Sequence, residues 1–464
     1  MRYIGPFFRM NSISAEEIKH QLFFFSKESL KNIVLNSKCG IVHYTKSNKK
    51  HSSNSDNNIF DKYSPLLCIY KKGNPKIVSK SNLSWDENTF KKEINVISNA
   101  LMTLSILELS DYYSLFKDVD KQLYELSEVY KKLAKYQLDF YSTSLRSPEG
   151  FFVDKKISSS NDSTFIDKKN KFKFSDQAFM MCAYYNYSNL APSDDDAAVY
   201  KNFALDILKM LSDFKEEIYS LSSQECNKLC LALNIFYDYS KEEKSKELVL
   251  DLMDLIKEKH TFNELSNEDI ELTTLENINF YLTYKNTGYL DFKEDFMSFS
   301  KKHLELFDSD KSIFNKNSDK KDIKYSSTEL LNYMFSSLIY FVDEDADSSY
   351  ENNISSLYKR ILLNGQLTTS WPDVPDIDSA ERYRNASLRS EDMFNEQLFK
   401  ISNITDSSDL CPVFRKEITY SKKKETITPS KDTFYAQRNM MIYFLAIYLF
   451  KKDIIQKTFD ISEV

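Results

Sequence analysis

Residues 222–240 read SSQECNKLCLALNIFYDYS, and this stretch decides the fold. Its apolar residues recur at steps of three and four, which places them on one face of a helix. Ser222 followed by Glu225 is a capping box, the pattern that starts many helices. The stretch therefore predicts a helix with a broad apolar face. The residues on that face are Cys226, Leu229, Cys230, Leu233 and Phe236.

The same helix start recurs along the chain at intervals of about 50 residues. It appears as Ser222…Glu225, Thr273…Glu276 and Ser326…Glu329, and Ser175 before Asp176 is a weaker earlier copy. More amphipathic, charged helices lie between these apolar ones, as expected for outer helices that face solvent. Each interval therefore holds one helical hairpin. With a first helix after Glu93 and a last one at Met440 to Phe450, we expect about six inner helices.

About six inner helices is the number that would close an α/α toroid, and two neighbouring segments carry a resemblance to known toroids. Glu149-Gly150-Phe151-Phe152 forms a turn, and Phe174-Ser175-Asp176-Gln177-Ala178 then opens an inner helix. This pattern resembles the six-hairpin α/α-toroid superfamily, which includes glycoside hydrolases, polysaccharide lyases and N-acylglucosamine 2-epimerase-like proteins. The resemblance covers residues 93–464 and implies a mainly α, (α/α)6 toroid of repeated helical hairpins. No catalytic motif of these families is matched, so no catalytic residue is carried over. An open α-solenoid is the alternative.

The chain before residue 93 has a different character. The capping box Ser14…Glu17 opens a helix towards Phe25, and a second short helix is expected from Lys27 to Asn36. Residues 66–71 are expected to form a strand. Residues 1–92 are therefore predicted to be a small α+β or irregular N-terminal segment. Residues 93–464 form the toroid-like domain, which contains an insertion at residues 364–429.

Composition excludes several classes of function. The 464 residues carry a net charge of -7, which argues against a nucleic-acid partner because phosphate binding needs a basic face. Only 6 glycines occur, and there is no Gly-rich phosphate loop, so no nucleotide or other cofactor is expected. The cysteines and histidines lack ligand spacing, so no metal is expected.

The hydropathy of the chain also bears on its location. The most apolar run, Met440 to Phe450, is shorter than the roughly 20 residues that span a membrane. The first ten residues lack the apolar core of a signal peptide. We therefore expect a cytoplasmic protein without a membrane partner. The sequence does not indicate an oligomeric state.

The insertion holds the densest polar cluster of the chain, at residues 370–392. Paired carboxylates suit general acid/base or sugar chemistry, arginines clamp carboxylates or phosphates, and tryptophan offers a platform for a sugar ring. In a toroid, loops at the N-terminal ends of the inner helices surround the central cavity, where an acid such as Asp176 also lies. The candidate catalytic residues are Asp176, Asp373, Asp376 and Asp378. The candidate ligand-binding residues are Trp371, Glu381, Arg382, Arg384, Arg389, Asp432 and Arg438.

Two functions remain open. The first is a carbohydrate-active protein of hydrolase, lyase or epimerase type that binds a saccharide or another small polar ligand. The second is a non-catalytic ligand-binding or protein-interaction scaffold, with the insertion as a partner or ligand surface. Structural roles stay open beside both, since the acids can be helix caps and the insertion a salt-bridged loop that closes the toroid. Acid pairs around an open cavity would favour the enzyme, and a ring filled by aromatic side chains would favour the scaffold.

Overall fold

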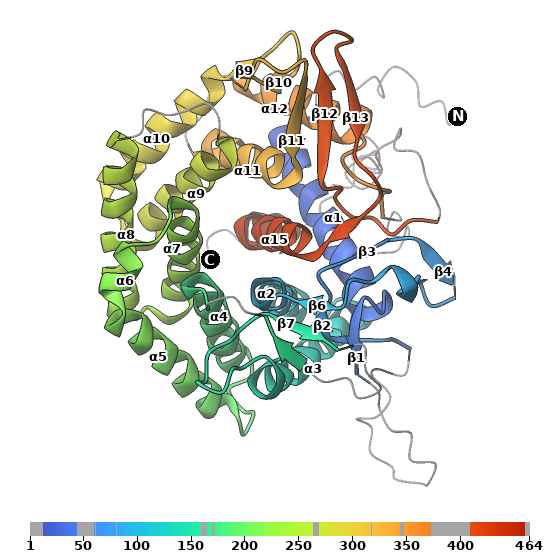
Figure 1. Ribbon diagram of the computed structural model, residues 1–464, viewed down its shortest axis with the longest axis vertical. Coiled ribbons are helices and arrows are strands. Elements are labelled where there is room, and N and C mark those ends of the chain that lie inside the picture. The colour runs from blue at the N-terminus through green and yellow to red at the C-terminus, as the bar shows by residue number, and fades with distance from the viewer. Residues whose placement is uncertain are drawn as a thin grey trace.

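The protein forms two concentric layers of helices, seen along the ring axis in Figure 1. The structure is a computed structural model. It describes residues 13–43, 60, 62–79, 81–158, 165–168, 172–262, 269–316, 318–343, 348–372 and 409–459.

The inner layer is a closed ring. Each inner helix packs against the next, and the last, α15, packs against the first, α2. The ring therefore confirms the predicted (α/α)6 toroid and excludes the open solenoid. The inner helices are α2 (Val96–Ser114), α4 (Phe174–Leu190), α7 (Ser223–Ser240), α9 (Ile270–Thr287), α11 (Ser327–Asp343) and α15 (Ala436–Phe459).

Each inner helix has an outer partner on the solvent side. Five of these partners follow their inner helix in the chain, but α15 pairs with α1, the first helix of the described chain. The outer helices are α3 (Lys121–Ser144), α5 (Ala197–Asp213), α8 (Glu243–Phe262), α10 (Leu290–Glu305), α12 (Ser348–Tyr358) and α1 (Ala15–Asn36). Shorter helical segments are η3 (Glu87–Thr89), α6 (Lys215–Tyr219) and η4 (Lys359–Asn364).

The N-terminal segment contributes one of these outer helices. Its capping box is confirmed, since the Ser14 hydroxyl accepts the Glu17 N–H and the Glu17 carboxylate accepts the Ser14 N–H. The expected break between two short helices is wrong, because α1 runs without interruption to Asn36. The residues of α1 share one apolar core with the later helices. The domain boundary at residue 92 stays a prediction.

The inner helices are buried on all sides. Every residue of α4 from Phe174 to Ser188 is buried, and so is every residue of α2 from Val96 to Ser110. A helix with no solvent-facing side has small or apolar residues all round, whereas the outer helices are amphipathic. Side chains therefore fill the ring along most of its height.

Buried polar contacts join neighbouring inner helices. The Asn234 amide donates to the Thr283 hydroxyl over 3.1 Å, and the Asn279 amide donates to the Asn227 carbonyl over 3.0 Å. These partners are 49 and 52 residues apart, so the contacts repeat with the hairpin period. A buried polar group is costly unless it is hydrogen-bonded, and these bonds fix each helix to its neighbour.

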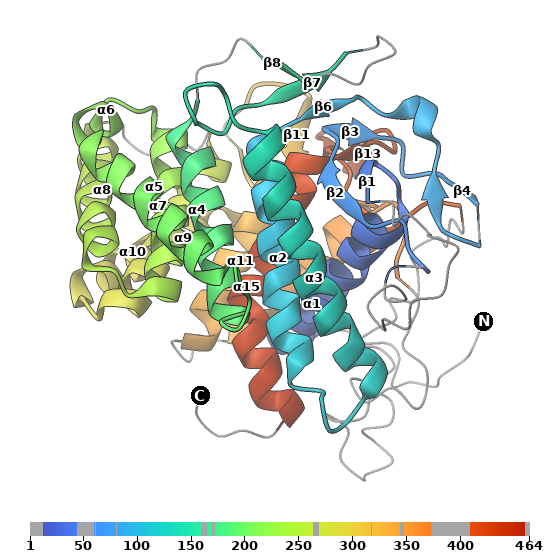
Figure 2. The ribbon, with the colours of Figure 1, turned by 90° about the horizontal axis from the view of Figure 1, so that it is seen from below.

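Short antiparallel strands lead into the inner helices. Figure 2 shows β6, β7, β8 and β11 at the end of the ring where these helices begin. The sheets are β1–β2, β3–β14, β4–β5, β6–β7–β8, β9–β10 and β11–β12–β13. Their strands are β1 (Gly40–Val42), β2 (Leu66–Ile69), β3 (Lys72–Gly73), β4 (Ile77–Ser79), β5 (Ser84–Trp85), β6 (Glu93–Ile94), β7 (Lys155–Ile157), β8 (Phe165–Asp167), β9 (Phe307–Asp308), β10 (Ile313–Phe314), β11 (Asp322–Ser326), β12 (Glu417–Ser421), β13 (Thr426–Pro429) and β14 (Phe434–Tyr435).

Among the described residues, no helix has both the length and the apolar character needed to cross a bilayer.

Candidate functional site

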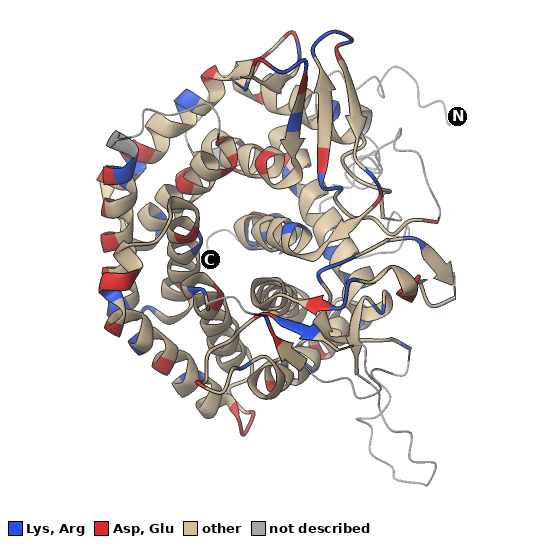
Figure 3. Ribbon diagram, viewed as in Figure 1, with Lys and Arg blue, Asp and Glu red and all other residues tan. Residues whose placement is uncertain are grey.

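The N-terminal ends of the inner helices meet at one end of the ring, which we call the mouth. Its polar side chains come from the first two turns of these helices, from residues just before them, and from Asp154, which accepts the Val96 N–H of α2 over 2.9 Å. Figure 3 shows acidic positions on α4, α7, α9 and α11 around the ring. The mouth comprises Asp154, Asp176, Glu225, Lys228, Glu271, Glu276, Ser326, Thr328, Glu329 and Arg438.

Side-chain hydrogen bonds connect the helices in series around the mouth. The Glu225 carboxylate of α7 accepts the Ser175 N–H of α4 over 3.0 Å. The Asn227 amide donates to Glu276 of α9 over 3.0 Å, and the Ser326 hydroxyl donates to Glu271 over 2.7 Å. The Arg438 guanidinium of α15 donates to the Thr328 hydroxyl of α11 over 2.9 Å. The mouth is therefore a preorganised polar surface.

Asp176 is the one residue of the predicted catalytic set that lies within the described part of the chain, and its carboxyl is strongly perturbed. It is 5% exposed, and its Oδ1 atom has no hydrogen-bond partner among the described residues. Burial raises its pKa to about 7, Lys173 opposes the rise, and the charges of Asp154 and Glu225 add to it. A carboxyl that titrates near neutrality can donate or accept a proton in catalysis.

Glu225 caps a neighbouring helix instead of completing its own capping box. The Ser222 hydroxyl accepts the Glu225 N–H over 3.4 Å, which confirms half of the predicted box. The Glu225 side chain reaches across to α4 and places a second carboxylate beside the residue that precedes Asp176. The charge of Glu225 therefore acts on Asp176 at the start of α4.

The predicted capping box at Thr273 and Glu276 is wrong. The helix α9 begins one turn earlier, because the Asp269 side chain accepts the Leu272 N–H over 3.0 Å and caps it. Glu276 therefore lies inside the helix and is 2% exposed. Burial raises its pKa to about 8, although the hydrogen bond from Asn227 opposes the rise.

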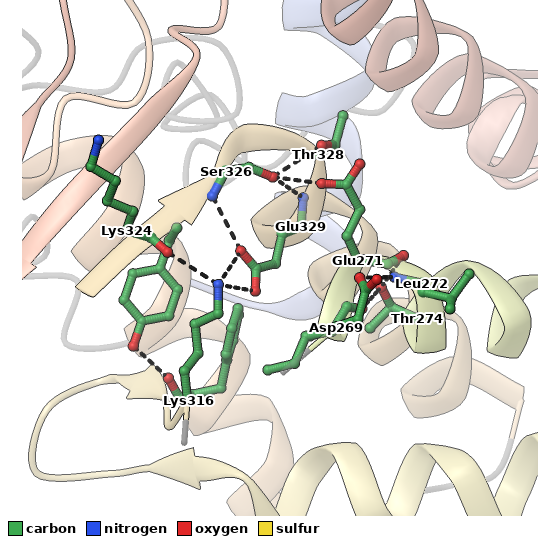
Figure 4. Close-up of polar contacts among 12 residues, drawn as sticks. Asp269, Glu271, Leu272, Thr274, Lys316, Lys324, Ser326, Thr328 and Glu329 are labelled. Atoms are coloured by element: carbon green, nitrogen blue, oxygen red, sulfur yellow. Dashed lines mark hydrogen bonds and ion pairs between the residues drawn. The ribbon is translucent and has the colours of Figure 1, made fainter. Parts of the chain in front are cut away.

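The capping box at Ser326 and Glu329 is confirmed (Figure 4). The Glu329 carboxylate also accepts a hydrogen bond from Lys316, and the two charges lie 2.6 Å apart at their closest. Burial raises the pKa of Glu329, and Lys316 opposes the rise. Figure 4 shows the Lys316 ammonium between this carboxylate and the Lys324 carbonyl. Glu329 is thus held by a cation and is less available than Asp176.

Asp432 holds a loop and lies exposed just before α15. Its Oδ1 atom accepts a hydrogen bond from Arg415 over 2.8 Å. Arg415 is buried and also donates to the carbonyls of Gln366 and Thr368. This arginine therefore ties together both described ends of the predicted insertion. A ligand-binding role for Asp432 stays a prediction.

Trp371 packs against the outer layer. Its ring lies 4.9 Å from the ring of Phe25 in α1. Its predicted role as a sugar platform stays a prediction. The other predicted residues of the insertion lie outside the described part of the chain; they are Asp373, Asp376, Asp378, Glu381, Arg382, Arg384 and Arg389. Of the remaining candidates, the structure brings Asp176 and Arg438 to the mouth.

The described residues contain no group of three or more His, Cys, Asp or Glu side chains that could hold a metal ion. Four acids of the mouth, Glu225, Glu271, Glu276 and Glu329, accept hydrogen bonds from amide, hydroxyl and lysine groups instead.

No sequence pattern singled out Lys228, Glu271, Lys316 or Arg415. The partners of Glu271, Lys316 and Arg415 are distant in sequence, so no local pattern marks these three residues. Arg415 is the clearest case, because it contacts residues 47 and 49 positions away.

Comparisons with known proteins give structural matches only. No family model and no curated protein matches the sequence. The cellobiose 2-epimerase of Bacillus thermoamylovorans B4167 is 12% identical, with 82% of this chain and 92% of that chain covered and a TM-score of 0.46. The cellulase Cel9M of C. cellulolyticium, solved in complex with cellobiose, is 12% identical, with 94% of this chain and 98% of that chain covered and a TM-score of 0.44. A sugar epimerase from a ruminal bacterium is 13% identical, with 82% of this chain and 92% of that chain covered and a TM-score of 0.46.

These proteins are similar to this chain in fold alone. The toroid itself is established by the closed ring of inner helices.

Proposed function

We propose that the chain is a carbohydrate-active toroid that binds a saccharide at the mouth and uses Asp176 as a general acid. The observation that carries the proposal is the environment of Asp176. It is a buried carboxyl with a pKa of about 7 and an unsatisfied oxygen, next to a second carboxylate from Glu225.

The chemistry of the mouth suits a ligand rich in hydroxyl groups. Carboxylates accept hydrogen bonds, lysine and arginine donate them, and the serine and threonine hydroxyls do both. A sugar hydroxyl can likewise donate and accept, so it can pair with every kind of group on this surface. Charge-assisted hydrogen bonds of this kind are stronger than bonds between neutral groups.

Two neighbouring carboxyls favour hydrolysis over other sugar chemistry. A protonated acid donates its proton to the leaving oxygen, while a second carboxylate acts as a base or nucleophile. In this proposal Asp176 supplies the proton and Glu225 is the second carboxylate. An epimerase or lyase would use the same acid at a different atom of the sugar. Identifying the products therefore shows which of these reactions takes place.

A substrate screen tests the proposal. The purified protein is incubated with neutral and acidic oligosaccharides, and the products are separated by chromatography. We expect turnover that falls as pH rises through about 7, because Asp176 then loses its proton. The Asp176→Asn variant should lose about 100-fold or more in kcat, the contribution typical of a general acid.

Asp291→Asn is the matched control, since Asp291 is an exposed acid in the first turn of the outer helix α10. Its activity should equal that of the unmodified protein. Full activity of Asp176→Asn would remove Asp176 from the mechanism.

One observation favours the non-catalytic alternative. The inner helices are buried on all sides below the mouth, so a ligand would rest on a filled ring. Saccharide binding without any product would assign the mouth to recognition alone.

A further inference from the structure

A second polar site lies at the opposite end of the ring, where the inner helices end. A cavity of about 710 Å³ opens there, and all six inner helices contribute to its walls. This volume falls within the range of about 300–1,000 Å³ typical of small-molecule sites. We call it the lower cavity, and we define it by Glu108, Asn186, Asp238, Tyr281, Asn286 and Lys451.

A buried carboxylate organises one wall of the lower cavity. Glu108 is 3% exposed and is the single charged residue in α2 between Val96 and Ser110. It accepts hydrogen bonds from the Asn186 amide and from the Tyr239 hydroxyl. The Lys451 ammonium lies 2.7 Å from Glu108 and 2.6 Å from Asp111. Four inner helices, α2, α4, α7 and α15, are thus joined through one acid.

The charged groups of the wall are already paired with one another. Asp238 accepts a hydrogen bond from the Tyr448 hydroxyl over 2.9 Å and forms an ion pair with Lys241 at 3.1 Å. Lys19 forms an ion pair with Asp453 at 2.5 Å. Lys451 is shared by two acids, but the five lysines of the wall outnumber its four acids, so the wall has no net negative charge to attract a cation. The lysines are Lys19, Lys241, Lys285, Lys451 and Lys452, and the acids are Glu108, Asp111, Asp238 and Asp453. The C-terminal ends of the six inner helices carry negative partial charge and disfavour an anion.

The remaining recognition groups are neutral donors, acceptors and rings. The Asn186 and Asn286 amides and the Tyr239 hydroxyl already donate to Glu108 or Asn234, so they meet a ligand chiefly through their oxygens, which accept hydrogen bonds. The paired ammonium groups supply donors, and Tyr281 adds an aromatic face. A ligand that fits must both donate and accept hydrogen bonds at many points without net charge.

We propose that the lower cavity binds a neutral, hydroxyl-rich small molecule of the mono- or disaccharide class. The site is separate from the mouth and goes beyond the proposed function, because it contains none of the mouth residues. It gives the ring two polar ends, of which only the mouth carries the acid proposed for catalysis.

Hydrogen–deuterium exchange with defined compounds tests this inference on the full chain. Cellobiose and mannose are the neutral compounds, inorganic phosphate is the anion and spermidine is the cation. We expect both sugars to protect residues 281–286 and 448–456 from exchange in a saturable manner, and phosphate and spermidine to leave them unchanged. Failure of both sugars to protect these residues, or stronger protection by phosphate or spermidine, would overturn the inference.

Two variants test whether the sugars bind in the lower cavity. Lys285→Trp puts an indole at the exposed edge of the wall and should weaken sugar binding about tenfold or more. Lys301→Trp is the matched control, an exposed lysine of α10 that does not line the lower cavity. Asn186→Leu removes a polar group from the wall and should act in the same direction. Unchanged binding in both cavity variants contradicts the inference.

The same experiment separates the two proposals. Asp176→Asn should keep the protection of residues 281–286 and 448–456. Protection confined to the mouth would overturn the lower-cavity site and leave the proposed function standing.

Discussion

Replacing Asp176 by asparagine is expected to stabilise the protein above neutral pH. Burial raises the pKa of this carboxyl from 3.8 to about 7, so the folded protein holds the proton more tightly than the unfolded chain does. The resulting stabilisation is fully present below pH 3.8 and is lost as pH rises to about 7. At about 1.4 kcal/mol for each pH unit, the loss amounts to about 4 kcal/mol. Asparagine does not ionise and avoids this loss.

Urea unfolding at pH 5 and pH 8 measures the effect. The unmodified protein should lose more stability between the two pH values than Asp176→Asn does, by about 2–3 kcal/mol, since part of the change occurs below pH 5. Asp291→Asn should follow the unmodified protein, because this acid is exposed. Equal pH dependence of Asp176→Asn and the unmodified protein would refute the reasoning. That result would mean that the folded structure holds the charged carboxylate at little cost.

Three further changes test how the ring and the mouth are held together. Arg415→Ala should lower the free energy of unfolding by about 2–4 kcal/mol in urea, because two carbonyls and Asp432 lose their donor; an unchanged midpoint contradicts this role. Glu329→Gln should cost about 1–3 kcal/mol by breaking the ion pair with Lys316, and the loss should be insensitive to salt because the pair is buried; a loss that vanishes in high salt argues against it. Asn234→Ala should cost about 1–3 kcal/mol by removing the bridge between α7 and α9, and a melting temperature equal to that of the unmodified protein would show that the bridge is not needed.

The ring was predictable because its signal is local and repeated. The apolar stripe at residues 226–236 and the capping boxes at Ser222 and Ser326 correspond to real inner helices. The predicted capping box at Thr273 was wrong because Asp269 caps the same helix one turn earlier. A sequence pattern shows that a residue can cap a helix, but competition with a neighbouring residue decides which one does.

The sixth outer helix was harder to predict. The helix α1 pairs with α15 at the other end of the chain, and the bond between Lys19 and Asp453 spans 434 positions. No periodicity links such distant segments. The contacts of Arg415 and the ion pair between Lys451 and Glu108 could not be predicted for the same reason. Glu108 did leave a local signal, since a single acid in the apolar run Val96–Ser110 requires a buried partner.

Asp176 was a candidate because it is an acid in the first turn of an inner helix. Its raised pKa could not be read from the sequence, because it depends on burial and on charges from Asp154 and Glu225. These residues lie 22 and 49 positions away and meet Asp176 only in the folded ring.

The most direct test of the central claim is a crystal structure of the Asp176→Asn variant soaked with cellobiose, mannose and an acidic oligosaccharide in turn. The variant retains the shape of the mouth but cannot donate the proton of a carboxyl, so a bound sugar persists. We predict a saccharide at the mouth with one of its oxygens within hydrogen-bonding distance of residue 176. Sugars absent from the mouth in every soak, or bound there beyond reach of residue 176, would contradict the assignment of this end of the ring as the active site.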